Sequence, residues 1–178
     1  MSEAIEQELS FSDRLYEGIG NLSFWADDEV NADSDGVTFM MKNICNKAEF
    51  NAVGNYSLVD TDSVNPVEFA SFYLVLAKKI DSSKMKYIIP ELYEMNLNYR
   101  NGVFVVDEPG NICFEARVPV PRDNLESAIQ AFAAEYMEIS DYLDAFYPFI
   151  LRLAAKPEDA SFNSYLKALF EHVTKLGE

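Results

Sequence analysis

The sequence predicts an α+β fold with an antiparallel sheet, and two observations support this. Apolar residues recur at helical spacing near the start, in the middle and over the last third of the chain. Between these segments lie short runs rich in Val, Phe, Tyr and Thr, separated by Asn, Asp, Gly and Ser, as is typical of antiparallel strands. The expected order is one helix, three or four strands, a helix, a two-stranded hairpin and two helices.

Length and composition favour one packed domain. The chain has 178 residues, of which 49% are hydrophobic and 13% aromatic, enough to bury a substantial core. We expect a single domain over residues 1–178, with residues 157–178 as an appended C-terminal helix.

The charge balance indicates which partners to expect. Acidic residues outnumber basic ones 30 to 14, which gives a net charge of -16. Such a charge repels phosphate backbones and anionic lipid, so we expect neither nucleic-acid nor membrane binding. It favours basic or amphipathic protein partners.

The first residues show no apolar stretch typical of a secretory signal, and no apolar run approaches the roughly 20 residues of a membrane span. We therefore expect a cytoplasmic protein, in which Cys45 and Cys113 are free thiols.

In the first half, the pattern predicts a helix over residues 3–22, with Phe11 as an alternative start because Ser10 and Ser12 interrupt the pattern. Four strand candidates follow, at residues 22–26, 36–45, 49–59 and 67–77. The last is ambiguous, because Asn65, Pro66 and Glu68 also suit a helix start. Its Val, Phe and Tyr content favours a strand.

A helix is predicted over residues 83–99, where Pro90 either kinks it or marks its first turn. Strands at residues 103–106 and 112–118 should form a hairpin. Residues 108–111 suit a type II turn, in which Pro109 sets the first central residue and Gly110 supplies the positive φ of the second.

Asp123 and Glu126 form a capping pair that should open a long helix to about residue 155, bent at Pro148. A last helix is expected over residues 158–176. Aromatic residues cover more than one face of the long helix. Three of them are candidates for a partner or dimer surface, together with the second helix: Tyr142, Phe146 and Phe149.

No motif predicts catalysis, a metal or a cofactor. Asn31, Asp33 and Asp35 match the first positions of a calcium loop, but Lys42 stands where the bidentate Glu belongs, which favours an acidic hairpin turn. His172 is the only histidine, so no histidine cluster exists. We expect no catalytic residues and no cofactor.

One long segment resembles a known family. The carrying residues are LYEMNLNYRNGVFVVDEPGNICFEARVPV and, later, EISDYLDAFYPFILRL, within residues 83–155. They resemble the YbjN family and, more broadly, the type III secretion chaperone-like fold. The shared features fall on Asn96, Gly102, Phe104, Asp107, Gly110, Val118 with Pro119, and the run from Phe146 to Pro148.

The resemblance implies a curved antiparallel sheet with helices against it, often in a homodimer, and no shared catalytic residues. It implies a non-enzymatic protein-binding module, chaperone-like or regulatory, which holds a partner through apolar grooves or a sheet edge. Two alternatives remain open: a small-ligand binder or carboxylate-dependent enzyme, and an acidic immunity-type antagonist of a basic protein.

Overall fold

A computed structural model describes residues 9–26, 28–42, 52–59, 68–99 and 101–176. The α+β class is confirmed. The described helices are α1 (Phe11–Gly20), α2 (Met85–Asn98), α3 (Leu125–Ala155) and α4 (Phe162–Leu176). The described strands are β1 (Val30–Asp33), β2 (Gly36–Met41), β3 (Ala52–Leu58), β4 (Glu68–Ala77), β5 (Val103–Val106) and β6 (Ile112–Val120).

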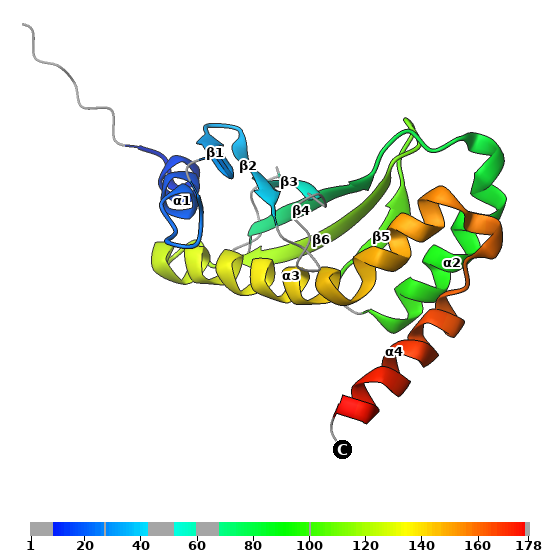
Figure 1. Ribbon diagram of the computed structural model, residues 1–178. Coiled ribbons are helices and arrows are strands. Elements are labelled where there is room, and N and C mark those ends of the chain that lie inside the picture. The colour runs from blue at the N-terminus through cyan, green and yellow to red at the C-terminus, as the bar shows by residue number, and fades with distance from the viewer. Residues whose placement is uncertain (1–8, 27, 43–51, 60–67, 100, 177–178) are drawn as a thin grey trace, which may run out of the picture.

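All six strands belong to one open antiparallel sheet with the order β1-β2-β3-β4-β6-β5. The strands β4 and β6, which are neighbours in the interior of the sheet, are the longest. Helices α1, α2 and α3 lie along one face, with α3 running beneath the sheet (Figure 1). The edges of the sheet are therefore β1 and β5.

Alternation along the strands builds the core on the helix-covered face. In β4, Ala70, Phe72 and Leu74 are fully buried, whereas the residues between them are only half-buried. The ring of Phe72 stacks on Phe132 of α3 at 5.3 Å. This aromatic contact fixes α3 across the centre of the sheet.

In the described residues the first helix starts at Phe11, because Ser10 and Asp13 form a reciprocal capping box there. Residues 3–8 of the predicted helix lie outside the described residues. The strand predicted over residues 22–26 is wrong, since these residues form turns. The indole N–H of Trp25 donates to the Ile19 carbonyl at 2.8 Å, which folds this apolar run back onto the end of α1.

The ambiguous fourth segment is a strand, β4, which pairs with both β3 and β6. Pairing on both sides overrides the helix-start signal at its beginning. The outer parts of the predicted strands 36–45 and 49–59, and Cys45, lie outside the described residues. The strand β1 was not predicted.

The hairpin between β5 and β6 is confirmed, but its turn lies one residue earlier than predicted. The Gly110 N–H donates to the Asp107 carbonyl at 2.9 Å, so Glu108 and Pro109 are the central residues. Gly110 follows them with φ at +84°. Gly110 is required because a Cβ there would lie 2.9 Å from the Ile80 carbonyl oxygen.

The long helix α3 is capped by Asn124, not by Asp123: the Asn124 side chain accepts the Ser127 N–H at 3.0 Å. Pro148 lies inside α3, which changes direction in its second half (Figure 1). Pro90 likewise lies inside α2 rather than in its first turn.

Helix α4 follows a 3₁₀ turn at Pro157–Asp159 and extends away from the sheet (Figure 1). None of the helices in the described ranges is long and apolar enough to cross a bilayer.

Candidate functional site

The two edges of the sheet differ in how their backbone groups are satisfied. At the β5 edge, the Asn96 side chain of α2 accepts the Phe104 N–H at 2.7 Å and donates to the Phe104 carbonyl at 2.9 Å. The amide thereby takes the place of a neighbouring strand. The middle of the β5 edge is closed to further pairing.

At the β1 edge, the register leaves backbone groups directed outward. The Met40 N–H donates to the Glu29 carbonyl at 2.7 Å, so this pair is a hydrogen-bonded one. Antiparallel pairs alternate between bonded and non-bonded, and Val30 and Ala32 occupy non-bonded positions opposite β2. Their N–H and C=O groups therefore point away from β2, toward the rim of the sheet.

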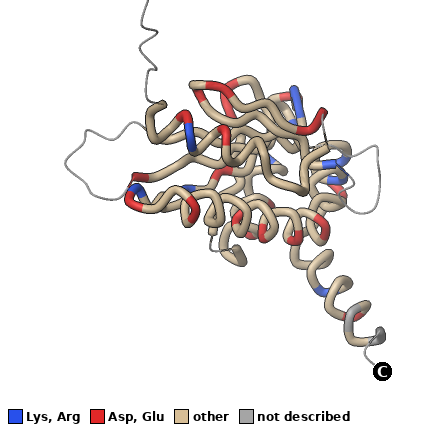
Figure 2. The backbone as a smooth tube through the Cα atoms, turned by 90° about the vertical axis from the view of Figure 1, so that its left-hand side faces the viewer, with Lys and Arg blue, Asp and Glu red and all other residues tan. Residues whose placement is uncertain are grey.

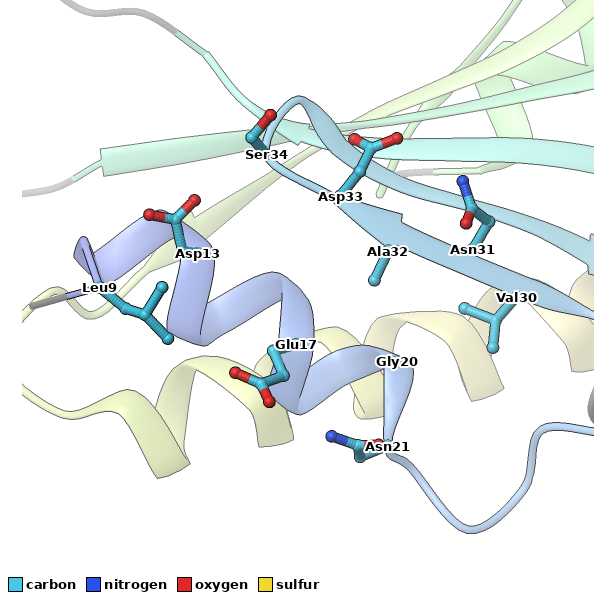
Figure 3. A pocket seen from close by; sticks show the side chains of 10 residues that line it. All are labelled: Leu9, Asp13, Glu17, Gly20, Asn21, Val30, Asn31, Ala32, Asp33 and Ser34. Carbon is cyan, nitrogen blue, oxygen red and sulfur yellow. The ribbon is translucent and has the colours of Figure 1, made fainter. Parts of the chain in front are cut away.

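A groove of about 460 Å³ runs along this rim between α1 and β1. Figure 3 shows its two walls, α1 below and β1 above, side by side over the length of β1. From α1 come Leu9, Asp13, Glu17, Gly20 and Asn21, and from β1 come Val30, Asn31, Ala32, Asp33 and Ser34. The open backbone edge thus lies inside a concave surface.

A close contact sets the distance between the two walls. A Cβ at Gly20 would meet the Ala32 Cβ at 3.0 Å, so a side chain at position 20 would push α1 away from β1. The middle of α1 is held by Tyr16, whose hydroxyl accepts the Leu58 N–H of β3 at 2.8 Å.

All charged residues that line the groove are acidic: Asp13, Glu17 and Asp33. The Asp13 carboxylate is held in place, since it accepts the Ser10 N–H at 3.1 Å and the Ser10 hydroxyl at 2.6 Å. Glu17 and Asp33 are exposed. Acidic positions also exceed basic ones along the chain trace (Figure 2).

A second hollow, of about 540 Å³, lies near β5 and is lined in part by Ser71, Glu115 and Arg117. One acidic and one basic side chain line this hollow. Its residues on β6 belong to a strand that already pairs with β4 on one side and β5 on the other. We therefore regard the groove beside β1 as the candidate site.

The thiol of Cys113 lies on the face of the sheet away from the helices. Burial raises its pKa to about 11, and the nearby Asp107 carboxylate also raises it. The hydrogen bond that the Tyr73 hydroxyl donates to the Cys113 Sγ atom at 3.0 Å lowers the pKa but does not offset these effects. A protonated thiol at neutral pH is a poor nucleophile.

The pKa of Asp107 is lowered: desolvation opposes this, but bonds from the Asn111 backbone and side chain, and from Tyr73, outweigh it. These hydrogen bonds tie the hairpin to β4, so this group of side chains has a structural role.

The three predicted interface aromatics lie in contacts within the chain. Phe149 is 1% exposed, and its ring lies 5.5 Å from Phe162 and 5.3 Å from Tyr165 of α4. Phe146 and Tyr142 are half-buried and contact each other at 4.4 Å. Because α4 covers Phe149, a second chain would reach this residue only after α4 moved. The homodimer interface at these aromatics remains a prediction.

Other side chains that the sequence singled out do not converge. His172 is exposed on α4. Asn31, Asp33 and Asp35 form the β1–β2 hairpin, as the acidic-turn interpretation predicts. Within the part of the chain that the structure describes, no three His, Cys, Asp or Glu side chains are grouped to hold a metal ion.

Sequence reasoning missed the groove because it missed β1. The strand has only four residues, and its alternation of Val30 and Ala32 with two polar residues is too short to stand out. The turn signal from Asp33 to Gly36 was a usable clue, since a hairpin turn before β2 implies a strand before the turn.

Comparison of the chain with the known protein families finds no match, and comparison with curated proteins finds none either.

Proposed function

We propose that this protein is a non-enzymatic, chaperone-like protein-binding module of the cytoplasm. It binds an extended segment of a partner protein as an added strand along β1. The observation that carries the proposal is the open backbone edge of Val30 and Ala32 within the groove beside α1. Main-chain pairing at such an edge supplies affinity, and side-chain contacts with the groove supply selection.

The contrast between the two edges supports the choice of β1. A sheet edge that has no binding role is usually blocked, and Asn96 does this at β5. No equivalent side chain in the described ranges bonds the outward groups of β1. The resemblance of residues 83–155 to chaperone-like proteins agrees with a role in holding non-globular segments.

The test removes one outward N–H. Ala32→Pro deletes the Ala32 N–H but leaves the Asn31 and Asp33 pairs with β2, because proline is tolerated on edge strands. Val106→Pro is the matched control, since Val106 occupies the equivalent outward position on the opposite edge. Circular dichroism first establishes that both variants are folded.

A photo-crosslinking residue at Asn21, which lines the groove, then reports on partners in the native cell. We expect one recurrent crosslinked segment in the parent chain and in Val106→Pro, and its loss in Ala32→Pro. A segment that crosslinks equally in Ala32→Pro contradicts strand addition at β1, and so does the absence of any recurrent segment.

A further inference from the structure

We infer that the segment bound beside β1 is basic, with Lys or Arg at every second position. This inference rests on the proposed strand addition and names the chemistry of its partner. Two carboxylates of α1 carry it, Asp13 and Glu17, which line the groove opposite the open edge (Figure 3).

The spacing of these carboxylates matches a strand. Asp13 and Glu17 are four residues apart on α1, which is about 6 Å along a helix axis. Two residues of a β-strand span about 6.6–6.8 Å. Because α1 and β1 lie side by side, side chains at i and i+2 of an added strand meet Asp13 and Glu17 in turn.

Alternation also assigns the side of the strand that must be basic. In β1, Val30 and Ala32 face the helix layer, whereas Asn31 and Asp33 face the other side. The strand added next to β1 has the same alternation. Only every second side chain therefore turns toward α1, so the pattern of basic residues matters as well as their number.

The charge of the groove excludes two other occupants. The sequence of residues 1–8, MSEAIEQE, has three glutamates and no Lys or Arg, so its charge does not complement the acidic wall. A second copy pairing through β1 would bring Asp13, Glu17 and Asp33 of both copies together. A basic segment from another protein is the occupant that the charges favour.

The experiment measures peptide binding to the full chain by fluorescence anisotropy at about 50 and 300 mM NaCl. One labelled hexapeptide, Lys-Val-Lys-Val-Lys-Thr, has alternating lysines. A second has the same residues with the three lysines consecutive. A third has Thr in place of every Lys. Each is measured with the parent chain, Ala32→Pro and Glu17→Gln, and with Glu158→Gln as a control for an exposed carboxylate outside the groove.

We expect the alternating peptide to bind at least fivefold more tightly than either other peptide. Ala32→Pro should abolish the binding, and Glu17→Gln should weaken it about two- to fivefold, the effect of one exposed ion pair. Glu158→Gln should change it less than 1.5-fold. Higher salt should weaken binding of the alternating peptide more than binding of the neutral peptide.

The outcomes separate the two proposals. If the neutral peptide binds as tightly and Ala32→Pro abolishes both, the strand addition stands and the basic pattern is wrong. If the peptide with consecutive lysines binds as tightly as the alternating one, net charge alone acts and the pattern is again wrong. If Ala32→Pro leaves every affinity unchanged, or no peptide binds, the proposed strand addition itself is overturned.

Discussion

Glu135 is a half-buried carboxyl. It lies on α3, and its Oε1 atom is buried without a hydrogen-bond partner in the described structure, as are the hydroxyls of Tyr56 and Tyr99. Burial raises the pKa of Glu135, and repulsion from Glu138 raises it further. The folded protein therefore favours the protonated form more than the unfolded chain does.

This pKa shift has a defined effect on stability. Since the pKa is raised on folding, the carboxyl costs no stability below its unfolded pKa, and the cost appears as pH rises through the folded pKa. Glu135→Gln should therefore be more stable than the parent chain at about pH 7, with a difference that shrinks toward about pH 4. Urea unfolding at both pH values measures it.

Asp141→Asn is the control, because Asp141 is an exposed carboxyl on the same helix. It should change stability by no more than about 0.5 kcal/mol at either pH. A Glu135→Gln variant that is less stable than the parent at pH 7 would contradict the assigned burial cost.

Asn96 closes the β5 edge with two hydrogen bonds to Phe104. Asn96→Leu should cost about 1–3 kcal/mol, because it leaves the Phe104 N–H and C=O unpaired in a half-buried site. It should also expose the edge and promote association through β5. Asn98→Leu, on the exposed side of the same helix, should be nearly neutral. Urea unfolding and light scattering measure the two effects.

At the scale of elements, α2 presents an apolar stripe on its outer side. Ile89, Tyr93 and Leu97, spaced four residues apart, are 56%, 61% and 62% exposed. By helical spacing, this stripe lies away from Glu91, whose carboxylate accepts the Phe162 N–H of α4 at 2.6 Å. The second helix was predicted to contribute to a homodimer, and the stripe gives that prediction specific residues.

Tyr93→Glu should therefore convert a dimer into a monomer in sedimentation velocity at about 100 µM. It places a charge in the middle of the stripe, where antiparallel pairing of two α2 helices would bring the two copies of residue 93 together. Tyr87→Glu is the matched control: Tyr87 is 43% exposed but lies a third of the way around the helix from Tyr93. A parent chain that sediments as a monomer would refute the dimer.

How far sequence predicts these elements depends on how local their signals are. The hairpin β5–β6 and the helices α2 and α3 carry dense periodic patterns, and all were predicted within a few residues. By contrast, residues 22–26 have a strand-like composition but cover the end of α1, because Trp25 finds its partner at Ile19. A contact between two segments therefore determines the conformation of residues 22–26, and such a contact cannot be predicted from local strand propensity.

The candidate site was less predictable than the fold for the same reason. Asp13 and Glu17 are ordinary helix-surface acids in the sequence, and four-residue β1 gives almost no pattern. Their significance arises only when Gly20 and Ala32 bring α1 against the sheet edge. The excess of acidic residues did correctly indicate the sign of the groove's charge.

At the scale of the whole molecule, α4 is joined to the rest by its first turns. Phe162 is fully buried, with its ring 5.5 Å from Phe149 and 5.7 Å from Phe146. The Tyr165 hydroxyl donates to the Ala145 carbonyl at 2.6 Å. Beyond these contacts the helix extends outward, and Phe170 is exposed. The predicted interface residues Phe146 and Phe149 are thus covered by a helix that is attached through Phe162 and Tyr165 of its first turns.

This attachment can be tested with two matched substitutions on α4. Phe162→Ala removes the buried ring, so the attachment of α4 should weaken by about 3–5 kcal/mol. Amide hydrogen exchange over Phe162–Leu176 should then accelerate, while the protected amides of β4 and β6 change little because they lie in the sheet centre. Phe170→Ala is the same change at an exposed position and should leave exchange in α4 unaltered. Equal acceleration in both variants would mean that the Phe162 contact does not hold α4 in place. The aromatic residues of α3 could then meet a partner without the partner having to displace a firmly attached α4.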